Sequence, residues 1–259
     1  MQDRYFGDVG DFGKYGLLRA LSGIEGQQSL RLGIVWYLFP DESHNADGKH
    51  IGYLLGDNPE FRNCDESLYD QLRALLFDDL GINEANRCLK SAEAPGLLPK
   101  DTVFYTEPLS YAPGLLSAAR NKLRTDWFAA SLAKTALADL VFLDPDNGIE
   151  CKIKRTAKKG PKYVYWDDID AFIGRGQSVV VYHHLGRTGG THAEQVETKL
   201  GQMRGRFGTR FETSAITFKR GSNRVYFIIA SPERKELLRL RISCFASSGW
   251  ARHFVTRQS

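Results

Sequence analysis

Short, largely apolar runs that end in polar turns are the main pattern along the chain. Four of them cover residues 32–38, 102–106, 140–143 and 178–182. Apolar runs of this length with almost no polar break are typical of strands that are buried on both faces of a parallel sheet. Residues 211–218 and 225–230 form two further runs, joined by the turn-forming residues 220–223, and this spacing predicts an antiparallel pair.

Helical spacing fills most of the gaps between these runs. We expect helices over residues 67–80, 83–92, 114–137, 191–206 and 233–244, and a short N-terminal helix around 17–21 that follows a glycine-rich segment, 7–16. Thr191 with Glu194 three residues later forms a capping box. Strands that alternate with helices predict an α/β fold: a three-layer, Rossmann-like, mostly parallel sheet with a C-terminal antiparallel hairpin. We expect a single domain, 1–259, with a helical insertion at 41–94.

The most informative segment is the one that follows the apolar run 140–143. It reads Asp144-Pro145-Asp146-Asn147-Gly148. A proline ends the ladder of a strand, and Asn-Gly is turn chemistry. Open α/β sheets bind their ligands at the carboxyl ends of their strands. This segment is therefore a candidate active-site loop, although an acidic loop that caps the next element would read in the same way.

Polar residues follow each of the four predicted parallel strands. Because the carboxyl ends of parallel strands meet at one edge of a sheet, we expect these residues to form a polar pocket there. They are Asp41, Glu42, His44, Glu107, Asp144, Asp146, Asn147, His183 and His184. A glutamate before a proline or a single histidine would each have an ordinary structural explanation, so the convergence carries the prediction.

The glycine-rich N-terminal segment is a second candidate. Gly7, Asp8, Asp11 and Lys14 lie where a loop enters a predicted helix, which can bring backbone N–H groups, a helix dipole and a cation close to an anion. The segment is not a Walker A loop, and it can equally be a tight entry to a packing helix. A second glycine-rich stretch, 185–191, carries Arg187, whose guanidinium can hold a phosphate or a carboxylate.

Charge is unevenly placed in this 259-residue chain, whose net charge is +4. Residues 152–162 hold six bases and no acid, whereas acids gather between 41 and 93. A basic C-terminal half is compatible with an RNA or DNA partner, with phosphate contacts from Lys154, Arg155, Lys158 and Lys159. A hydrated surface that keeps the protein soluble is the alternative.

Localisation follows from what the chain lacks. The sequence contains no apolar run of membrane-spanning length, and its N-terminus does not read as a secretory signal. The four cysteines are scattered and form no CxxC pair, which is typical of reduced thiols. We therefore expect a cytoplasmic protein that does not bind membranes.

The chain resembles the class I S-adenosylmethionine-dependent methyltransferases, most closely the rRNA adenine methyltransferases. Gly7 to Tyr15 is similar in spacing to the N-terminal motif that folds over the cofactor in that family. Leu143-Asp144-Pro145-Asp146-Asn147 is similar to the start of the family's Asp-Pro-Pro-aromatic tetrapeptide, and the C-terminal hairpin matches its last strands. The chain differs in having no glycine-rich loop after the first strand, where residues 39–43 stand, and in having Asp146 and Asn147 at the third and fourth positions.

The resemblance implies S-adenosylmethionine as cofactor and a nucleic-acid base or nucleotide as acceptor. The residues that it implies for the cofactor are Gly7, Asp8, Asp11, Lys14, Asp41 and Glu107. Asp144, Asp146, Asn147 and His184 would be catalytic, because an aspartate and the carbonyl beside a proline can accept hydrogen bonds from an exocyclic amine and align its lone pair. Lys154, Arg155, Lys158, Lys159 and Arg187 would bind the substrate.

Two alternatives remain open at the level of sequence. A divalent-metal-dependent phosphodiesterase or nuclease would use Mg²⁺ or Mn²⁺ held by Asp144, Asp146, His183 and His184, with Asp8, Asp11 and Glu150 as further oxygen ligands. No compact motif such as HExxH supports it. A non-catalytic nucleic-acid-binding scaffold of the same fold is the other alternative, because the usual glycine-rich cofactor loop is missing.

Overall fold

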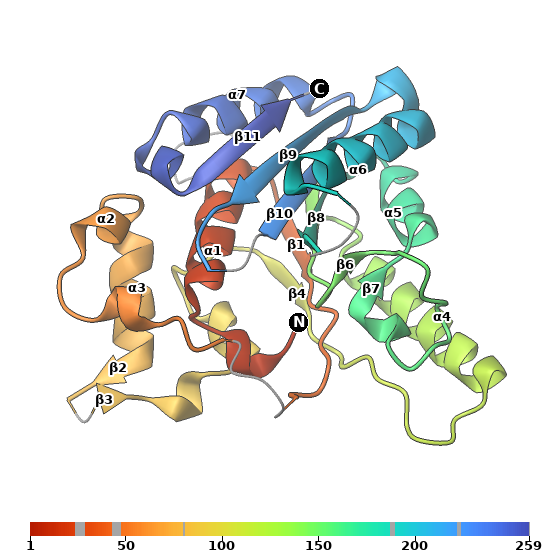
Figure 1. The fold of residues 1–259 in the computed structure, drawn as a ribbon, viewed down its shortest axis with the longest axis horizontal. Helices are drawn as coiled ribbons and strands as arrows, with labels where there is room; N and C mark the ends of the chain where they lie inside the picture. Colours follow the sequence, from red (N-terminus) through yellow and green to blue (C-terminus); the bar gives the residue numbers. More distant parts are fainter. Residues whose placement is uncertain (24–28, 43–47, 80, 187–189, 222–223, 259) are drawn as a thin grey trace.

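A seven-stranded mixed sheet organises the protein. The computed structural model describes residues 1–23, 29–42, 48–79, 81–186, 190–221 and 224–258 (Figure 1). The strand order is β11-β9-β10-β8-β5-β1-β4. Two small two-stranded sheets accompany it, β2 (Phe77–Asp78) with β3 (Gly81–Ile82) and β6 (Gly148–Ile149) with β7 (Tyr163–Val164).

Four strands form the parallel half of the sheet: β1 (Leu32–Val35), β4 (Val103–Tyr105), β5 (Leu140–Leu143) and β8 (Ser178–His184). They confirm the four predicted runs, although β1 is shorter than its apolar run and β8 extends through the histidine pair. From β1 the chain goes outward to β4 and then returns to place β5 on the other side of β1. The carboxyl ends of β1 and β5 therefore flank a point where the strand order reverses, which is where open α/β sheets bind ligands.

The other half of the sheet is antiparallel. The predicted C-terminal hairpin is confirmed as β9 (Glu212–Phe218) and β10 (Arg224–Ala230), and β10 pairs with β8. An additional edge strand, β11 (Phe254–Gln258), pairs with β9 and was not predicted. Three parallel and three antiparallel pairings in the described residues make the sheet mixed and not mostly parallel.

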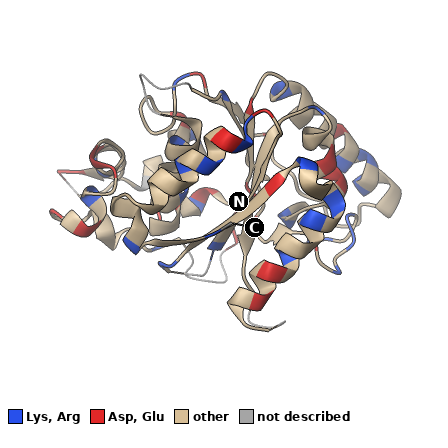
Figure 2. Ribbon diagram, turned by 90° about the horizontal axis from the view of Figure 1, so that it is seen from above, with Lys and Arg blue, Asp and Glu red and all other residues tan. Residues whose placement is uncertain are grey.

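Helices pack on both faces of the sheet. Neighbouring residues of one strand show this, since they belong to two different hydrophobic clusters, one on each face. Phe142 packs in the cluster with α1 (Val9–Ser22), α3 (Glu66–Leu76) and α7 (Lys235–Ala246). Its neighbours Val141 and Leu143 pack in the cluster with α4 (Ser117–Lys134), α5 (Trp166–Ile173) and α6 (His192–Phe207). Seen from above, helices lie on either side of the strands (Figure 2). The capping box of Thr191 and Glu194 at the start of α6 is present as predicted.

The glycine-rich N-terminal segment is helical, which corrects the prediction of a loop before a short helix. Helix α1 begins at Val9, so Gly10, Gly13 and Gly16 lie within it. Residues three apart share a helix face. A Cβ atom on these glycines would lie 2.3 Å from Arg224 Cζ, 2.7 Å from the Phe218 ring and 2.1 Å from the Trp250 ring, respectively. The glycines therefore let α1 approach its neighbours closely.

Residues 48–94 add short elements beside α1. They comprise α2 (Pro59–Arg62), α3, the β2–β3 pair and the 3₁₀ turns Gly52–Leu54, Glu84–Asn86 and Leu89–Glu93. The helix predicted over 83–92 is not formed, because Cys88 is extended (φ −142°, ψ 153°) and separates two 3₁₀ turns. Helix α3 buries Leu68, Leu72 and Leu76 in the α1 cluster. The remaining 3₁₀ turns are Asp3–Tyr5, Gly160–Lys162, Gly208–Arg210 and Gly249–Arg252. None of the described helices is both long and apolar enough to span a membrane.

Candidate functional site

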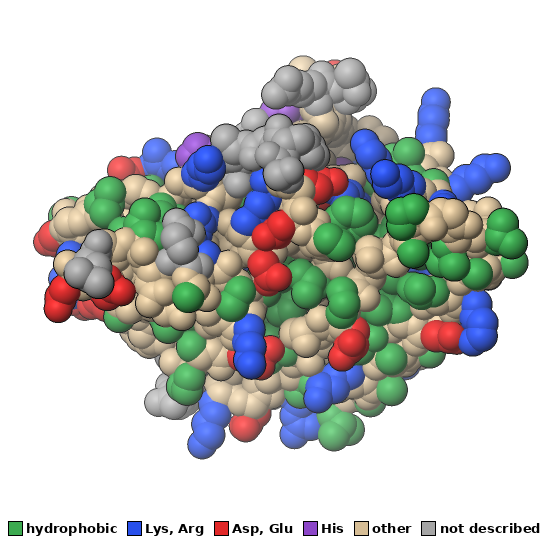
Figure 3. All heavy atoms as spheres, turned by 90° about the horizontal axis from the view of Figure 1, so that it is seen from below, with side chains coloured by type: hydrophobic (Ala, Val, Ile, Leu, Met, Phe, Trp, Pro, Cys, Tyr) green, Lys and Arg blue, Asp and Glu red, His purple; other side chains and the backbone are tan. Residues whose placement is uncertain are grey.

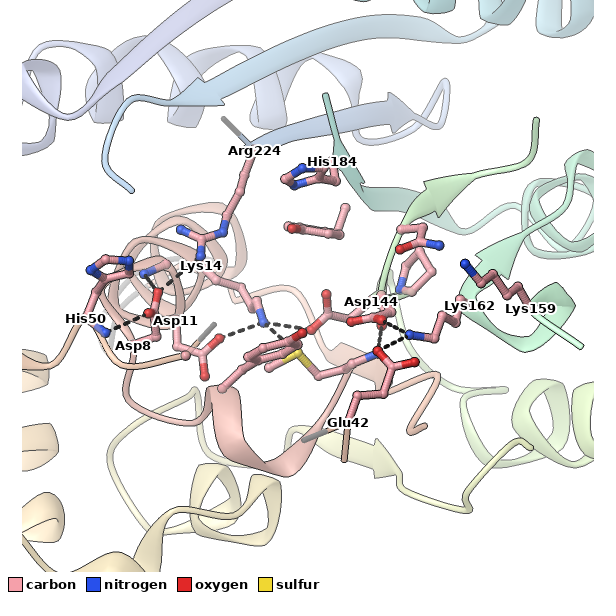
Figure 4. Close-up of a pocket in the computed structure, with 18 residues that line it drawn as sticks. Asp8, Asp11, Lys14, Glu42, His50, Asp144, Lys159, Lys162, His184 and Arg224 are labelled. Atoms are coloured by element: carbon pink, nitrogen blue, oxygen red, sulfur yellow. Dashed lines mark hydrogen bonds and ion pairs between the residues drawn. The ribbon is translucent and has the colours of Figure 1, made fainter. Parts of the chain in front are cut away.

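A cavity of about 430 Å³ opens at the carboxyl ends of the parallel strands. Its walls come from the start of α1, the loops after β1 and β5, the end of β8 and the start of β10 (Figure 4). This volume lies within the range of small-molecule sites. The lining residues include Asp8, Gly10, Asp11, Lys14, Glu42, His50, Asp144, Pro145, Asp146, Asn147, Lys159, Lys162, Tyr182, His184 and Arg224.

Lys14 forms the centre of a buried ion network. Its Nζ lies 2.8 Å from Asp11 Oδ1 and 2.7 Å from Asp144 Oδ2, and all three side chains are at most 4 % exposed. Burial lowers the pKa of Lys14, but the two carboxylates raise it more, so the net shift is upward and the ammonium persists. Burial raises the pKa of Asp11 against the opposing effect of Lys14. The network joins helix α1 to the end of β5.

A second lysine is held in the same way on the other side of the cavity. Lys162 Nζ lies 2.7 Å from Glu42 Oε2 and 2.8 Å from Asp146 Oδ2. The side-chain amide of Gln2 donates to the same two carboxylates, at 3.3 and 3.2 Å. Burial raises the pKa of Asp146, but the Met1 amino group and Lys162 lower it more. For Glu42 the pKa is also lowered, since Lys162 outweighs the effect of burial.

Asp8 connects three segments of the cavity wall by hydrogen bonds. As the N-cap of α1, its Oδ1 accepts a hydrogen bond from Gly10 N at 2.8 Å. The same oxygen accepts from Arg224 Nη2 at 3.1 Å, and Oδ2 accepts from the backbone N–H of His50 at 3.1 Å. One carboxylate therefore starts a helix and fixes two cavity-lining segments that are distant in sequence.

The loop after β5 is anchored on both sides. Asn147 N donates to Lys162 O at 3.0 Å, and His184 N donates to Asn147 O at 3.2 Å. Ile149 N donates to His183 Nδ1 at 3.0 Å. Gly148 has a φ of +115°, and a Cβ there would lie 2.3 Å from His183 Nδ1, so both the conformation and the close approach require glycine. Burial, with Lys199 nearby, lowers the pKa of His183 to about 3, so the ring is a neutral acceptor.

The cavity brings together most of the predicted site residues. Those that line it are Asp8, Asp11, Lys14, Glu42, Asp144, Asp146, Asn147, Lys159 and His184. Gly7 does not line it but is buried (φ +79°) against Leu76. Glu107 is exposed, and its backbone carbonyl accepts from Trp127 Nε1. Asp41 is also exposed and accepts from the backbone N–H of Arg4 at 3.4 Å. His44 lies outside the described residues.

The basic segment contributes less to the cavity than its composition predicts. Lys159 lines the cavity, whereas Lys154 and Lys158 are exposed elsewhere on the segment. Arg155 stacks on the Tyr165 ring at 4.8 Å and pairs with Asp167. In the view from below, Lys and Arg side chains gather at the upper right, whereas Asp and Glu side chains lie among them over the rest of this face (Figure 3). Arg187 lies outside the described residues.

Sequence reasoning missed Arg224, His50 and Tyr182 as cavity residues and placed Lys162 only within a basic run. Arg224 immediately precedes the predicted strand 225–230, and only the pairing of β10 with β8 in the structure places it directly opposite His184. Tyr182 lies two residues before His184 on β8 and so shares its face of the sheet. His50 carries no comparable signal, since its position depends on the contact of its backbone with Asp8.

Each carboxylate of the cavity has one oxygen engaged by a cationic side chain. Lys14 and Lys162 each stand between two carboxylates, where a bridging metal ion would otherwise lie. His183 uses Nδ1 for a backbone hydrogen bond. In the described part of the chain no three Asp, Glu, His or Cys side chains are grouped so that they could hold a metal ion.

Searches for similar proteins leave the site to be interpreted from its geometry. No protein-family model matches the chain, and no curated protein matches it.

Proposed function

We propose that the protein is an S-adenosylmethionine-dependent methyltransferase of the Rossmann-like class that acts on an amino group of a nucleic-acid base or nucleotide. The observation that carries this proposal is the position of the cavity. It lies at the carboxyl ends of β1 and β5, where the strand order reverses, and it contains Asp144 and Pro145 together with the start of α1.

The mixed charge of the cavity supports a ligand that carries both positive and negative groups. Its lining holds four Lys or Arg side chains and the Met1 amino group against five Asp or Glu side chains, so the formal charges balance. S-adenosylmethionine combines a sulfonium and an ammonium with one carboxylate, and it supplies an activated methyl group. The Asp11 and Asp144 carboxylates suit its cationic groups, and Lys159 suits its carboxylate.

Asp144 is placed to orient an acceptor amine. Its Oδ2 is held by Lys14, whereas Oδ1 has no hydrogen-bond partner among the described residues. The free oxygen and the carbonyl at Pro145 can accept the two N–H bonds of an exocyclic amine, which would align the nitrogen lone pair for transfer. Lys14 then acts as the group that fixes the Asp144 carboxylate in one orientation.

The occupied carboxylates favour this function over metal-dependent phosphoester hydrolysis. A two-metal site needs carboxylate oxygens that are free to ligate. Here one oxygen of Asp144 and one of Asp146 accept a hydrogen bond from a buried lysine ammonium, so a metal ion that used both oxygens of either carboxylate would have to displace the lysine.

Ligand-dependent thermal unfolding tests the proposal. We expect S-adenosylmethionine or S-adenosylhomocysteine to stabilise the protein, by about 2.7 kcal/mol at a hundred times Kd. Mg²⁺ and Mn²⁺ are measured in parallel. A shift with metal alone would transfer the assignment to a phosphodiesterase. No shift with either sulfur nucleoside, together with retained binding of nucleic acid, would identify a non-catalytic scaffold.

A variant locates the methyl transfer in this cavity. Asp144→Asn keeps the size of the side chain and removes the charge, so methyl transfer is expected to fall by more than the affinity for the cofactor. Asp126→Asn on the exposed surface of α4 is the matched control and should behave as wild type. Equal loss in both variants would contradict a role for Asp144.

A further inference from the structure

Three nitrogen-bearing side chains meet at the Arg224 end of the cavity. Arg224 lies directly across the β8–β10 ladder from His184, so both side chains are on the same face of the sheet. A Cβ on Gly221 would lie 3.5 Å from Arg224 Nη1 and 4.0 Å from His50 Cδ2, so the guanidinium and the imidazole of His50 both border the same small space. Figure 4 shows the Arg224 guanidinium between the two rings.

The guanidinium is held in place from behind. Asp8 Oδ1 accepts from Arg224 Nη2, and the carbonyl of Arg220 accepts from Nη1 at 3.4 Å. The backbone of α1 passes so close at Gly10 that any side chain there would collide with the guanidinium carbon. The Arg224 side chain is only 16 % exposed and is therefore part of the cavity wall and not a mobile surface group.

Arg224 keeps unused hydrogen-bonding capacity. A guanidinium has five N–H donors, and the contacts with Asp8 and Arg220 use two of them in the described part of the chain. Lys14 and Lys162 differ, because each ammonium is already shared by two carboxylates. Among the described residues Arg224 forms an ion pair with a single carboxylate, that of Asp8, so it can accept an anionic ligand without giving up its structural partner.

From this arrangement we infer that the Arg224 end of the cavity is a binding site for a phosphate group, with His50 and His184 as flanking ring N–H donors. A guanidinium binds two phosphate oxygens at once, and donors on either side can reach the remaining oxygens of a tetrahedral anion. A planar carboxylate would leave one of the flanking rings unused. Under the proposed function, the phosphate bound at this end of the cavity belongs to the acceptor nucleotide. The phosphate site itself does not depend on methyl transfer.

Calorimetric titration without any sulfur nucleoside tests the inference. The probes are inorganic phosphate, AMP, adenosine, and a short single-stranded RNA with and without a 5′-phosphate. We expect phosphate and AMP to bind and adenosine to bind more weakly than AMP. Preference for the 5′-phosphorylated RNA would assign a monoester, and equal binding of both RNAs above adenosine would assign the phosphodiester backbone.

Substitution of Arg224 gives the decisive comparison. In Arg224→Gln the affinity for AMP should fall by roughly 10- to 100-fold, since a charge-assisted pair of hydrogen bonds is lost, while the affinity for adenosine is unchanged. His184→Gln at an exposed position should weaken AMP binding less, and it tests the site even if Arg224→Gln does not fold. Arg204→Gln on α6, whose nearest carboxylate is 4.0 Å away, is the matched control.

Three results would overturn the phosphate site: equal binding of AMP and adenosine by wild type, an unchanged AMP affinity in both variants, or displacement of inorganic phosphate by the homocysteine carboxylate of S-adenosylhomocysteine. The last result would assign Arg224 to the cofactor. Binding of phosphate without any effect of a sulfur nucleoside would keep this site and remove the methyltransferase proposal, so the two inferences fail separately.

Discussion

Lys14 and Lys162 have the same partners in kind but different surroundings. Each ammonium stands between two carboxylates, one of them on the loop after β5. Around Lys14 no side chain of the network is more than 4 % exposed, whereas Glu42 beside Lys162 is 28 % exposed. Gln2 also supports the Lys162 network with two further hydrogen bonds.

The difference shows why the number of ion pairs is a poor measure of their importance. A pair in contact with water can exchange its partner for water, and such pairs contribute little to stability. A pair that is shielded from water cannot exchange its partner in this way, and removal of one member leaves an uncompensated charge in the interior. Lys14 should therefore be essential to the fold, and Lys162 should mainly position the loop that carries Asp146.

The largest effect is expected for Lys14→Met. It leaves Asp11 and Asp144 buried without their cation, which should lower the free energy of unfolding by about 3–5 kcal/mol, as measured by urea denaturation. The double variant Asp11→Asn/Lys14→Met removes one of the two charges and should recover part of the loss. A single variant as stable as wild type would show that the two networks do not differ in the way described.

A smaller effect is expected for Lys162→Met. Asp146 keeps the Gln2 amide as a donor, and Glu42 remains in contact with water. We expect a loss of about 1–3 kcal/mol in the same denaturation experiment. A loss equal to that of Lys14→Met would mean that exposure does not distinguish the two networks.

The smallest effect is expected for Glu42→Gln, about 0–1 kcal/mol at pH 7. Its pH dependence is more informative. The pKa of Glu42 is lowered in the folded protein, so its contribution is present above the unfolded value of 4.5 and is lost as the pH falls below it. Glu42→Gln should therefore lose less stability than wild type between pH 5 and pH 3. Parallel curves over that interval would contradict the assigned role of Lys162.

Asp11 should show the opposite sign. Because burial raises its pKa, the folded protein binds a proton more readily than the unfolded chain, and the contribution of Asp11 to stability improves as the pH falls. Asp11→Asn should remove this improvement. Denaturation at pH 7, 5 and 4 measures it, and a wild-type pH profile in Asp11→Asn would contradict the assignment.

Much of the sheet could be predicted because apolar runs and turn residues are local signals. The run 140–143, the turn at Asn147-Gly148 and the hairpin of β9 and β10 follow from residues that are close in sequence. Strand β11 could not be predicted, since only its first two residues, Phe254 and Val255, are apolar and Arg257 lies near its end. The glycines of α1 led to the wrong prediction of a loop over residues 7–16. Their role there is to allow close packing of Phe218 and Trp250, which lie more than two hundred residues away.

The site was predictable to the extent that it follows the ends of strands. Asp144, Asp146 and His184 follow or end their strands, so topology alone brings them together. The pairing of Lys14 with Asp144 and of Arg224 with Asp8 joins elements that only the assembled fold brings together. His50 reaches the cavity from a loop, and the sequence of that loop has no periodic pattern from which its position could be predicted.

Asp8 and Arg224 are 216 positions apart, and Lys14 and Asp144 are 130 apart. Contacts of such long range form late, because the entropy of closing large loops must be overcome first. A chain emerging during synthesis therefore carries the whole N-terminal motif without a cavity, and the site comes into existence only when β10 joins the sheet. Binding of a ligand to this cavity would report completed folding and not the presence of the motif.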